Sequence, residues 1–370
     1  MTARHSQLAC FFFVASASCA TAQSPARKPL EEKRAAAVDA AIMAELQKQG
    51  IVGAAVGILQ NNEIVYLKAY GFENREKKTP ATVQTIFNWA SNSKPLAAVA
   101  AMQLVEKNQL DLDADVRRYV PEFPAKDHTI TTRHLLTHQS GIPHYTNGKV
   151  IPTQRNYDHK RPFADPVIAL DRFNQSPLLF TPGTKVSYST YAYILLSAVI
   201  QKAGKSPFRT QVEQRIAKPA GMTSLQLDVE YSQQPHWSIG YVKNRQGEVV
   251  ATRDEANDWK HGGGGFKSNI ADFARWAQAL NAGKLLSHDM QRETWSVQSL
   301  ADGTKTSWGL GFTVEDQNGL KVSHNGKQDE VTTRMVLYPQ SRHGVVFMCN
   351  CGFGEVGAIT TAVYKALSSK

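Results

Sequence analysis

The sequence predicts an α+β fold in which both ends of the chain build one antiparallel sheet and a helical part is inserted between them. Strand-like alternation is confined to about residues 31–90 and 230–370, whereas about 91–229 is mostly helical. Amphipathic helices at 31–50 and 356–367 are placed to flank the sheet from the two ends of the chain. This distribution favours one interleaved domain for a chain of 370 residues.

The N-terminal elements are separated by clear turn signals. The helix at 31–50 closes on Gly50, a common helix stop. Strands at 53–59 and 63–69 are joined across Gln60-Asn61-Asn62, which predicts a hairpin. A strand-like segment at 85–90 then leads into an apolar helix that begins at the tetrapeptide Ser91-Asn92-Ser93-Lys94.

The rest of the chain contains one more strongly apolar helix and a second group of strands. The helix is expected at 190–203, and the polar, proline-containing stretch 147–177 is expected to be a long loop that could cover a site. Further strands are expected near 238–242, 248–252, 309–314, 321–324, 332–338 and 345–350, followed by the helix at 356–367.

The first 22 residues have the pattern of a secretory signal peptide. A short basic lead precedes an apolar run at 8–17, and Ala20-Thr21-Ala22 offers a small-x-small cleavage site. We therefore expect export to the periplasm or beyond, with residues 23–370 as the folded domain. A lipid anchor at Cys19 is the alternative. No later segment is apolar for long enough to cross a bilayer, so stable membrane insertion is not expected.

Charge and cysteine content narrow the function classes. The net charge is +10, and cleavage after residue 22 removes only Arg4 and leaves +9. The basic residues are scattered, which favours an acidic substrate or the cell envelope over nucleic acid. Cys349 and Cys351 lie two apart on a predicted strand, where a bridge would be strained, so buried free thiols are expected.

The tetrapeptide at 91–94 contains a candidate nucleophile and its base. A serine and a lysine three residues apart at a helix start share one face, so the amine of Lys94 can reach the hydroxyl of Ser91. A serine needs a neighbouring base to become a good nucleophile. A lysine can act as this base only where burial and nearby positive charge lower its pKa.

Two later segments offer the other groups that such a site needs. Tyr188 follows a turn and precedes the helix at 190–203. Beside a cationic lysine its pKa is expected to be depressed, which would let it act as base and acid. Core packing is the alternative for this tyrosine. His324 and Gly326 lie on a predicted strand, where glycine lets a ligand approach the backbone closely.

In this order the motifs resemble those of the penicillin-recognising serine hydrolases, and more narrowly the class C beta-lactamase and D-aminopeptidase group, peptidase family S12. The family pattern is Ser-x-x-Lys, then Tyr-x-Asn, then Lys/His-x-Gly. Further landmarks are 135–143 (LLTHQSGIP), 262–268 (GGGGFKS) and 308–312 (WGLGF). Stretches 119–124 (YVPEFP) and 142–145 (IPHY) are most similar to animal mitochondrial serine beta-lactamase-like proteins, serine peptidases that form filaments. The resemblance implies the beta-lactamase/penicillin-binding-protein fold.

The resemblance also implies a two-step acyl transfer that needs no cofactor. Ser91 attacks a carbonyl while Lys94 and a Tyr188 phenolate take its proton. Tyr188 then protonates the leaving group and later activates water. The backbone N–H groups of Ser91 and Lys327 are expected to bind the oxyanion.

By the same resemblance, Thr190, His324 and Gly326 orient the substrate. Thr190 departs from the common pattern, because most of the family has asparagine there, and His324 stands in place of lysine, as in the aminopeptidase and esterase branches. Both changes disfavour strong hydrolysis of penicillins and cephalosporins.

The sequence thus predicts an exported serine hydrolase that acts through an acyl-enzyme on amide or ester bonds, with a peptidase as the first choice. A beta-lactamase, D,D-carboxypeptidase or esterase of the same fold is an alternative, as is a penicillin-binding or filament-forming protein without turnover. The expected partner is a small peptide, amide or ester, and a homo-oligomer or filament stays open. No nucleic-acid partner is expected.

The sequence patterns that could indicate a metal or a phosphate site are weaker than the serine motif. His134 and His138 have an i, i+4 spacing that zinc sites use, but the glutamate of the metalloprotease motif and a third ligand are missing, so no metal is expected. The glycines at 262–265 lack the P-loop spacing and are interpreted as a turn close to the active site. Four aromatic residues are candidates for lining a substrate cleft, although core packing is favoured for most of them: Trp89, Tyr119, Tyr145 and Tyr157.

Overall fold

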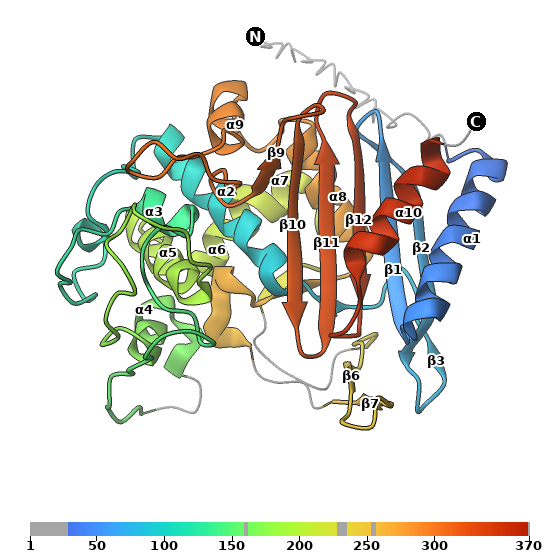
Figure 1. Ribbon diagram of the computed structural model, residues 1–370, viewed down its shortest axis with the longest axis horizontal. Helices are drawn as coiled ribbons and strands as arrows, with labels where there is room; N and C mark the ends of the chain where they lie inside the picture. Colours follow the sequence, from blue (N-terminus) through green and yellow to red (C-terminus); the bar gives the residue numbers. More distant parts are fainter. Residues whose placement is uncertain (1–28, 159–161, 228–234, 253–256, 369–370) are drawn as a thin grey trace, which may run out of the picture.

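A seven-stranded antiparallel sheet forms the centre of the computed structural model, which describes residues 29–158, 162–227, 235–252 and 257–368 (Figure 1). The strand order is β3-β2-β1-β12-β11-β10-β9. The N-terminal part supplies β1 (Gly53–Gln60), β2 (Glu63–Asn74) and β3 (Thr79–Pro80), and the C-terminal part supplies β9 (Thr313–Glu315), β10 (Lys321–Gln328), β11 (Val331–Tyr338) and β12 (His343–Cys349). The α+β prediction is confirmed. The predicted signal peptide lies outside the described residues.

Helices cover both faces of this sheet. Helices α1 (Glu32–Gln49) and α10 (Val356–Ser368) pack together on one face, and α8 (Ile270–Asn281) lies on the other (Figure 1). Because both faces are covered, seven of the eight β1 residues are buried, a continuous apolar pattern rather than an alternating one. No helix among the described residues is long and apolar enough to cross a membrane.

Local sequence explains the turns that open the fold. Asn61 and Asn62 have φ angles of 52° and 62°, so the hairpin between β1 and β2 uses the left-handed turn that asparagine tolerates. Gly50 ends α1 in the left-handed conformation with φ 72°. Both turn predictions are confirmed.

The inserted helical part packs beside the end of the sheet that β10 and β9 form. Helix α2 (Ser93–Glu106) is buried for nearly its whole length and contacts α5 (Thr190–Ala203), which has the predicted bounds. The shorter helices are α3 (Thr132–Leu136), α4 (Pro166–Ala169), α6 (Phe208–Val212), α7 (Lys218–Ala220) and α9 (His288–Thr294).

Three local predictions were wrong. Strands β6 (Tyr241–Lys243) and β7 (Val249–Ala251) form a separate two-stranded ribbon instead of joining the main sheet. The segment before Ser91 contributes only the short β4 (Phe87–Asn88), which pairs with β8 (Phe266–Ser268), itself paired with β5 (Gln226–Leu227). The stretch 147–177 contains α4 and the buried side chains of Leu170 and Phe173, so its second half is anchored in the core rather than free to act as a lid.

The two C-terminal thiols agree with the sequence prediction. Cys349 and Cys351 are both buried and free. Burial raises the pKa of each thiol, so neither favours the reactive thiolate.

Candidate active site

A strained turn presents Ser91 at the start of α2. Ser91 lies in the 3₁₀ turn η1 (Ala90–Asn92), and the preceding Ala90 has a φ of 47°. A non-glycine residue in this region costs on the order of 1–3 kcal/mol and persists only where its surroundings enforce it. Here the N–H of Ala90 donates to Oδ1 of Asn88 at 2.6 Å, and the amide of Asn92 lies 2.8 Å from Oγ1 of Thr333.

Lys94 is completely buried next to this serine. Its Nζ lies 3.1 Å from Oγ of Ser91 and 3.2 Å from Oγ1 of Thr190. A third contact, a hydrogen bond of 2.6 Å, is donated to the backbone carbonyl of Gly263. Burial lowers the pKa of Lys94 well below its usual value, and the positive charge of Lys260 lowers it further.

These three contacts match a neutral amine. Two N–H groups can donate to Gly263 and Thr190, which leaves the nitrogen lone pair directed at the hydroxyl of Ser91. A neutral, buried amine at this distance can accept the serine proton, which a solvated ammonium cannot do.

The glycine run at 262–265 is the close turn that the sequence predicted. A Cβ on Gly263 would lie 2.7 Å from Cγ2 and 3.0 Å from the carbonyl oxygen of Thr190, and a Cβ on Gly262 would lie 2.6 Å from Cβ of Ala97. Only glycine therefore lets this backbone reach Lys94 between α2 and α5.

The charge state expected for Tyr188 was wrong. Burial raises the pKa of this phenol, although a hydrogen bond between its side chain and that of Ser91 partly opposes the shift. The expectation of a phenolate assumed a cationic Lys94, whose own pKa is lowered. The structure does bring the two together, with Nζ of Lys94 4.7 Å from the centre of the Tyr188 ring. The raised pKa leaves the Tyr188 phenol protonated at neutral pH, close to Ser91.

Two histidines hold the segment that carries Tyr188 and Thr190. The N–H of Ser189 donates to Nδ1 of His138 at 3.2 Å, and the N–H of Thr190 donates to Nδ1 of His144 at 3.1 Å. Burial lowers the pKa of His138 well below its usual value and that of His144 to about 4. The rings of His138 and Tyr188 lie 4.3 Å apart.

The histidine pair considered for zinc does not share a helix face. Helix α3 ends at Leu136, and His138 lies beyond it with a φ of 58°. Nδ1 of His134 instead accepts the N–H of Thr131. Across the part of the chain that the structure describes, no three His, Cys, Asp or Glu side chains are grouped as metal ligands.

Strand β10 brings the third motif against the serine turn. β9 pairs with β10 only at residues 321–323, so β10 extends beyond its neighbour from His324 onward. A Cβ on Gly326 would lie 2.4 Å from the carbonyl oxygen of Trp89, which explains why this close approach requires glycine. The oxyanion role of the backbone N–H groups of Ser91 and Lys327 stays a prediction.

His324 is buried and neutral. Its Nδ1 lies 2.6 Å from the carbonyl oxygen of Asn325, which can only accept, so Nδ1 bears the proton. Burial lowers the pKa of His324 to about 3. His324 thus carries no positive charge at neutral pH.

Sequence reasoning missed two groups of this site. Lys260 is nearly buried and its charge acts on Lys94, yet the only signal was its position three residues before Gly263. His144 follows the conspicuous 135–143 stretch directly.

Of the four aromatic residues considered for the cleft, Trp89 is fully buried, while Tyr119 and Tyr157 hydrogen bond to Asp111 and Asp171. The side chain of Tyr145 contacts that of a site residue, Thr190.

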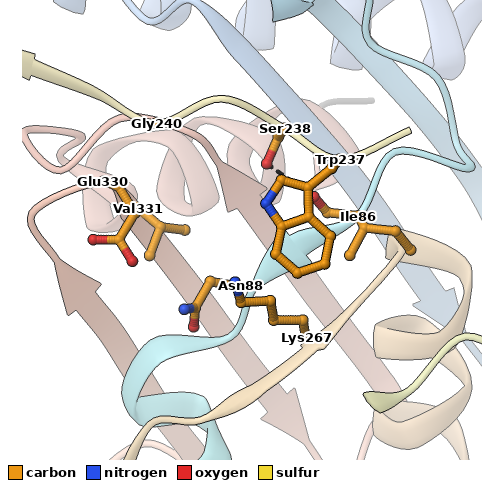
Figure 2. A pocket seen from close by; sticks show the side chains of 8 residues that line it. All are labelled: Ile86, Asn88, Trp237, Ser238, Gly240, Lys267, Glu330 and Val331. Atoms are coloured by element: carbon orange, nitrogen blue, oxygen red, sulfur yellow. Dashed lines mark hydrogen bonds between the residues drawn. The ribbon is translucent and has the colours of Figure 1, made fainter. Parts of the chain in front are cut away.

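A small enclosed pocket behind the serine turn is too small to bind substrate. Figure 2 shows the aliphatic chain of Lys267 passing beneath the indole of Trp237, with Asn88 and Glu330 on the other side. The cavity measures about 10 Å³, which at most suits one water. Asn88 connects it to the site, because its Oδ1 holds Ala90.

Known proteins show the same fold and related sequences. Penicillin-binding protein 4* of Bacillus subtilis is 27% identical over 318 residues, which cover 82% of this chain. The chain spans 62–68% of the length of the curated relatives it matches. Among solved structures, EstCE1, a hydrolase with promiscuous acyltransferase activity, is 22% identical with a TM-score of 0.77 and covers 91% of this chain and 99% of its own.

A second solved structure and the family match complete the comparison. The D-amino acid amidase of Ochrobactrum anthropi SV3 is 20% identical with a TM-score of 0.73, and the alignment covers 89% of this chain and 98% of the amidase. A sequence model of the family described as Beta-lactamase matches residues 38–369, which is nearly all of the described structure. With Ser91 and Lys94 in contact at its centre, the chain belongs to the beta-lactamase family of serine hydrolases.

Proposed function

We propose that this protein is an exported serine hydrolase that cleaves amide or ester bonds through an acyl-enzyme on Ser91, with small peptides as the first substrate class. The observation that carries the proposal is the buried Lys94 amine, 3.1 Å from Oγ of Ser91 and hydrogen bonded so that its lone pair is free for the serine proton. The neutral Tyr188 beside it supplies an acid for the leaving group.

The chemistry divides into acylation and deacylation. Oγ of Ser91 forms a bond to the substrate carbonyl carbon while its proton passes to Nζ of Lys94. The new ammonium lies 4.7 Å and 5.5 Å from the ring centres of Tyr188 and Tyr193, whose faces favour a cation. The bond to the leaving group breaks as the Tyr188 hydroxyl protonates it, and Lys94 returns the proton to Tyr188. Water then releases the acyl group by the reverse sequence of proton transfers.

The part of β10 beyond its pairing with β9 suits an extended substrate. β9 pairs with β10 only at residues 321–323, and a peptide can add its backbone to the part of a strand edge that such pairing leaves. A neutral His324 offers no charge for a carboxylate, which supports neutral peptide, amide or ester groups over beta-lactams.

Mass spectrometry of the intact protein tests this function directly. Incubation with a p-nitrophenyl ester should add one acyl mass to the wild type and none to Ser91→Ala, which should keep the fold by circular dichroism. Ser93→Ala is the matched control: the Ser93 hydroxyl accepts the N–H of Phe266 at 3.2 Å and lies outside the proposed chemistry. Acylation or turnover by Ser91→Ala at the wild-type rate would overturn the proposal.

A penicillin-binding protein without turnover is the second candidate, supported by the penicillin-binding relative. A fluorescent penicillin followed by a chase separates the two. A label on Ser91 that persists indefinitely, without hydrolysis of peptides, amides or esters, would favour this candidate. Slow release of the label would favour the hydrolase.

Export and assembly complete the proposal. Cleavage before Gln23 is expected, with the product in the periplasm or outside the cell, and N-terminal sequencing of the protein purified from each cell fraction would check it. Light scattering of the same material would show whether the chain is a monomer, an oligomer or a filament.

A further inference from the structure

Three aromatic rings from separate segments meet beside Thr190. Tyr145 follows the stretch 135–143, Tyr191 lies in the first turn of α5, and Trp259 lies in the turn η6 (Asp258–Gly263) that leads to the glycine run. Their centroids are 6.0–6.3 Å apart in all three pairs. We call these three residues the aromatic corner.

The aromatic corner is tied to the proposed chemistry through one side chain. Thr190 lies 3.2 Å from Nζ of Lys94, and its hydroxyl hydrogen bonds to that of Tyr145. A substrate carbonyl held at Ser91 is therefore separated from the Tyr145 ring by the side chains of Lys94 and Thr190.

The corner is both rigid and open. Tyr191 is 4% exposed and stacks on Phe173 at 4.6 Å with an interplanar angle of 15°. The guanidinium of Arg172 lies 4.1 Å above the ring of Trp259. Tyr145, in contrast, is 44% exposed, which is unusual for an aromatic side chain so close to a buried site. An exposed ring backed by fixed rings is preorganised for a planar apolar ligand.

We propose that Tyr145 and Trp259 form a specificity subsite that receives an aromatic group of the substrate. The proposal rests on the function proposed above and names its substrate class: amides or esters that bear a phenyl-like group next to the scissile bond. Edge-to-face contacts with the two rings, which lie at 78° to each other, favour such a group over a saturated one of equal size.

Matched aromatic and saturated esters test the subsite. One pair is methyl phenylacetate and methyl cyclohexylacetate; the other is benzyl acetate and cyclohexylmethyl acetate, so the pairs place the ring on the acyl or the alcohol side. Wild type should prefer the aromatic member of at least one pair by about 3- to 10-fold in kcat/KM. Tyr145→Leu and Trp259→Leu should move that ratio towards one, whereas Tyr145→Phe, which keeps the ring, should preserve it.

Two further measurements separate this inference from the proposed function. Ser91→Ala should abolish hydrolysis of all four esters, and hydrolysis that persists in this variant refutes the function whatever the ratios are. Calorimetry with phenylacetamide and cyclohexylacetamide on folded Ser91→Ala measures the same preference without turnover. A ratio near one in wild-type hydrolysis and in this binding assay, or a ratio that both leucine variants leave unchanged, would overturn the subsite.

Discussion

The carbonyl of Gly263 accepts a hydrogen bond of 2.6 Å from Nζ of Lys94, the shortest contact of a lysine that is buried at the centre of the molecule. This bond joins the glycine loop to the base of the site. With this bond made, Nζ of Lys94 lies 3.1 Å from Oγ of Ser91.

Gly263→Ala should lower kcat/KM by about 100-fold, the usual cost of moving a catalytic group by about 1 Å. The new Cβ would lie 2.7 Å from Cγ2 of Thr190, so the loop must withdraw from Lys94. Gly357→Ala is the matched control, because it lies in α10 with its nearest neighbour 3.9 Å away. Ester hydrolysis by both variants checks the prediction, and an unchanged rate for Gly263→Ala would contradict it.

Lys260→Gln should shift the acidic limb of the kcat/KM profile to higher pH. The charge of Lys260 helps to lower the pKa of Lys94, so its removal raises that pKa and leaves less neutral amine at a given pH. As the pH is lowered, Lys260→Gln should therefore lose activity at a higher pH than the wild type does. Lys260→Arg retains the charge and should keep the wild-type profile. A limb that moves to lower pH, or moves equally in both variants, would show that Lys260 acts by packing instead.

His324→Lys should increase acylation by a fluorescent penicillin about 10- to 100-fold, because a charge-assisted hydrogen bond to the penicillin carboxylate becomes available. The wild-type imidazole is neutral, with a pKa lowered to about 3. Glutamine is neutral, so His324→Gln should show no increase in acylation by the penicillin. Time courses of labelling, with an uncharged ester in parallel, give the comparison. Equal gains for lysine and glutamine, or none for a folded lysine variant, would exclude a charge effect.

Most of the helices, strands and turns could be predicted from the sequence, because each depends on a local residue pattern or on the order of such patterns along the chain. The asparagine turn, Gly50 and the apolar helix at 190–203 each depend on neighbouring residues, and six of the seven strands of the sheet, all but the two-residue β3, lie where strand patterns occur. Ser91 and Lys94 were found for the same reason, since three residues of helix set their distance. The ribbon of β6 and β7 was misplaced because a strand pattern does not say which sheet it joins.

What sequence could not give is the charge state of the site. Tyr188 was expected to be a phenolate because a lysine is ordinarily cationic. Lys94 departs from this through burial and through Lys260, which is 166 residues away in the chain. The metal-site interpretation of His134 and His138 failed for a similar reason. Helix α3 ends at Leu136, so the i, i+4 spacing does not put the two side chains on one helix face. Such properties arise only when separate segments have packed.

Tyr188→Phe should separate the acid of the site from its base. If the neutral phenol protonates the leaving group, its loss should slow amide hydrolysis about 100- to 10,000-fold. Acylation by a p-nitrophenyl ester, whose leaving group needs no proton, should fall less than about tenfold. Tyr193→Phe is the matched control, since that hydroxyl donates to the carbonyl of Leu136. Stopped-flow release of p-nitrophenol and anilide turnover supply the two rates. An equal, large loss on both substrates would instead mean that Tyr188 takes the proton of Ser91, and Lys94 would lose its place as the base.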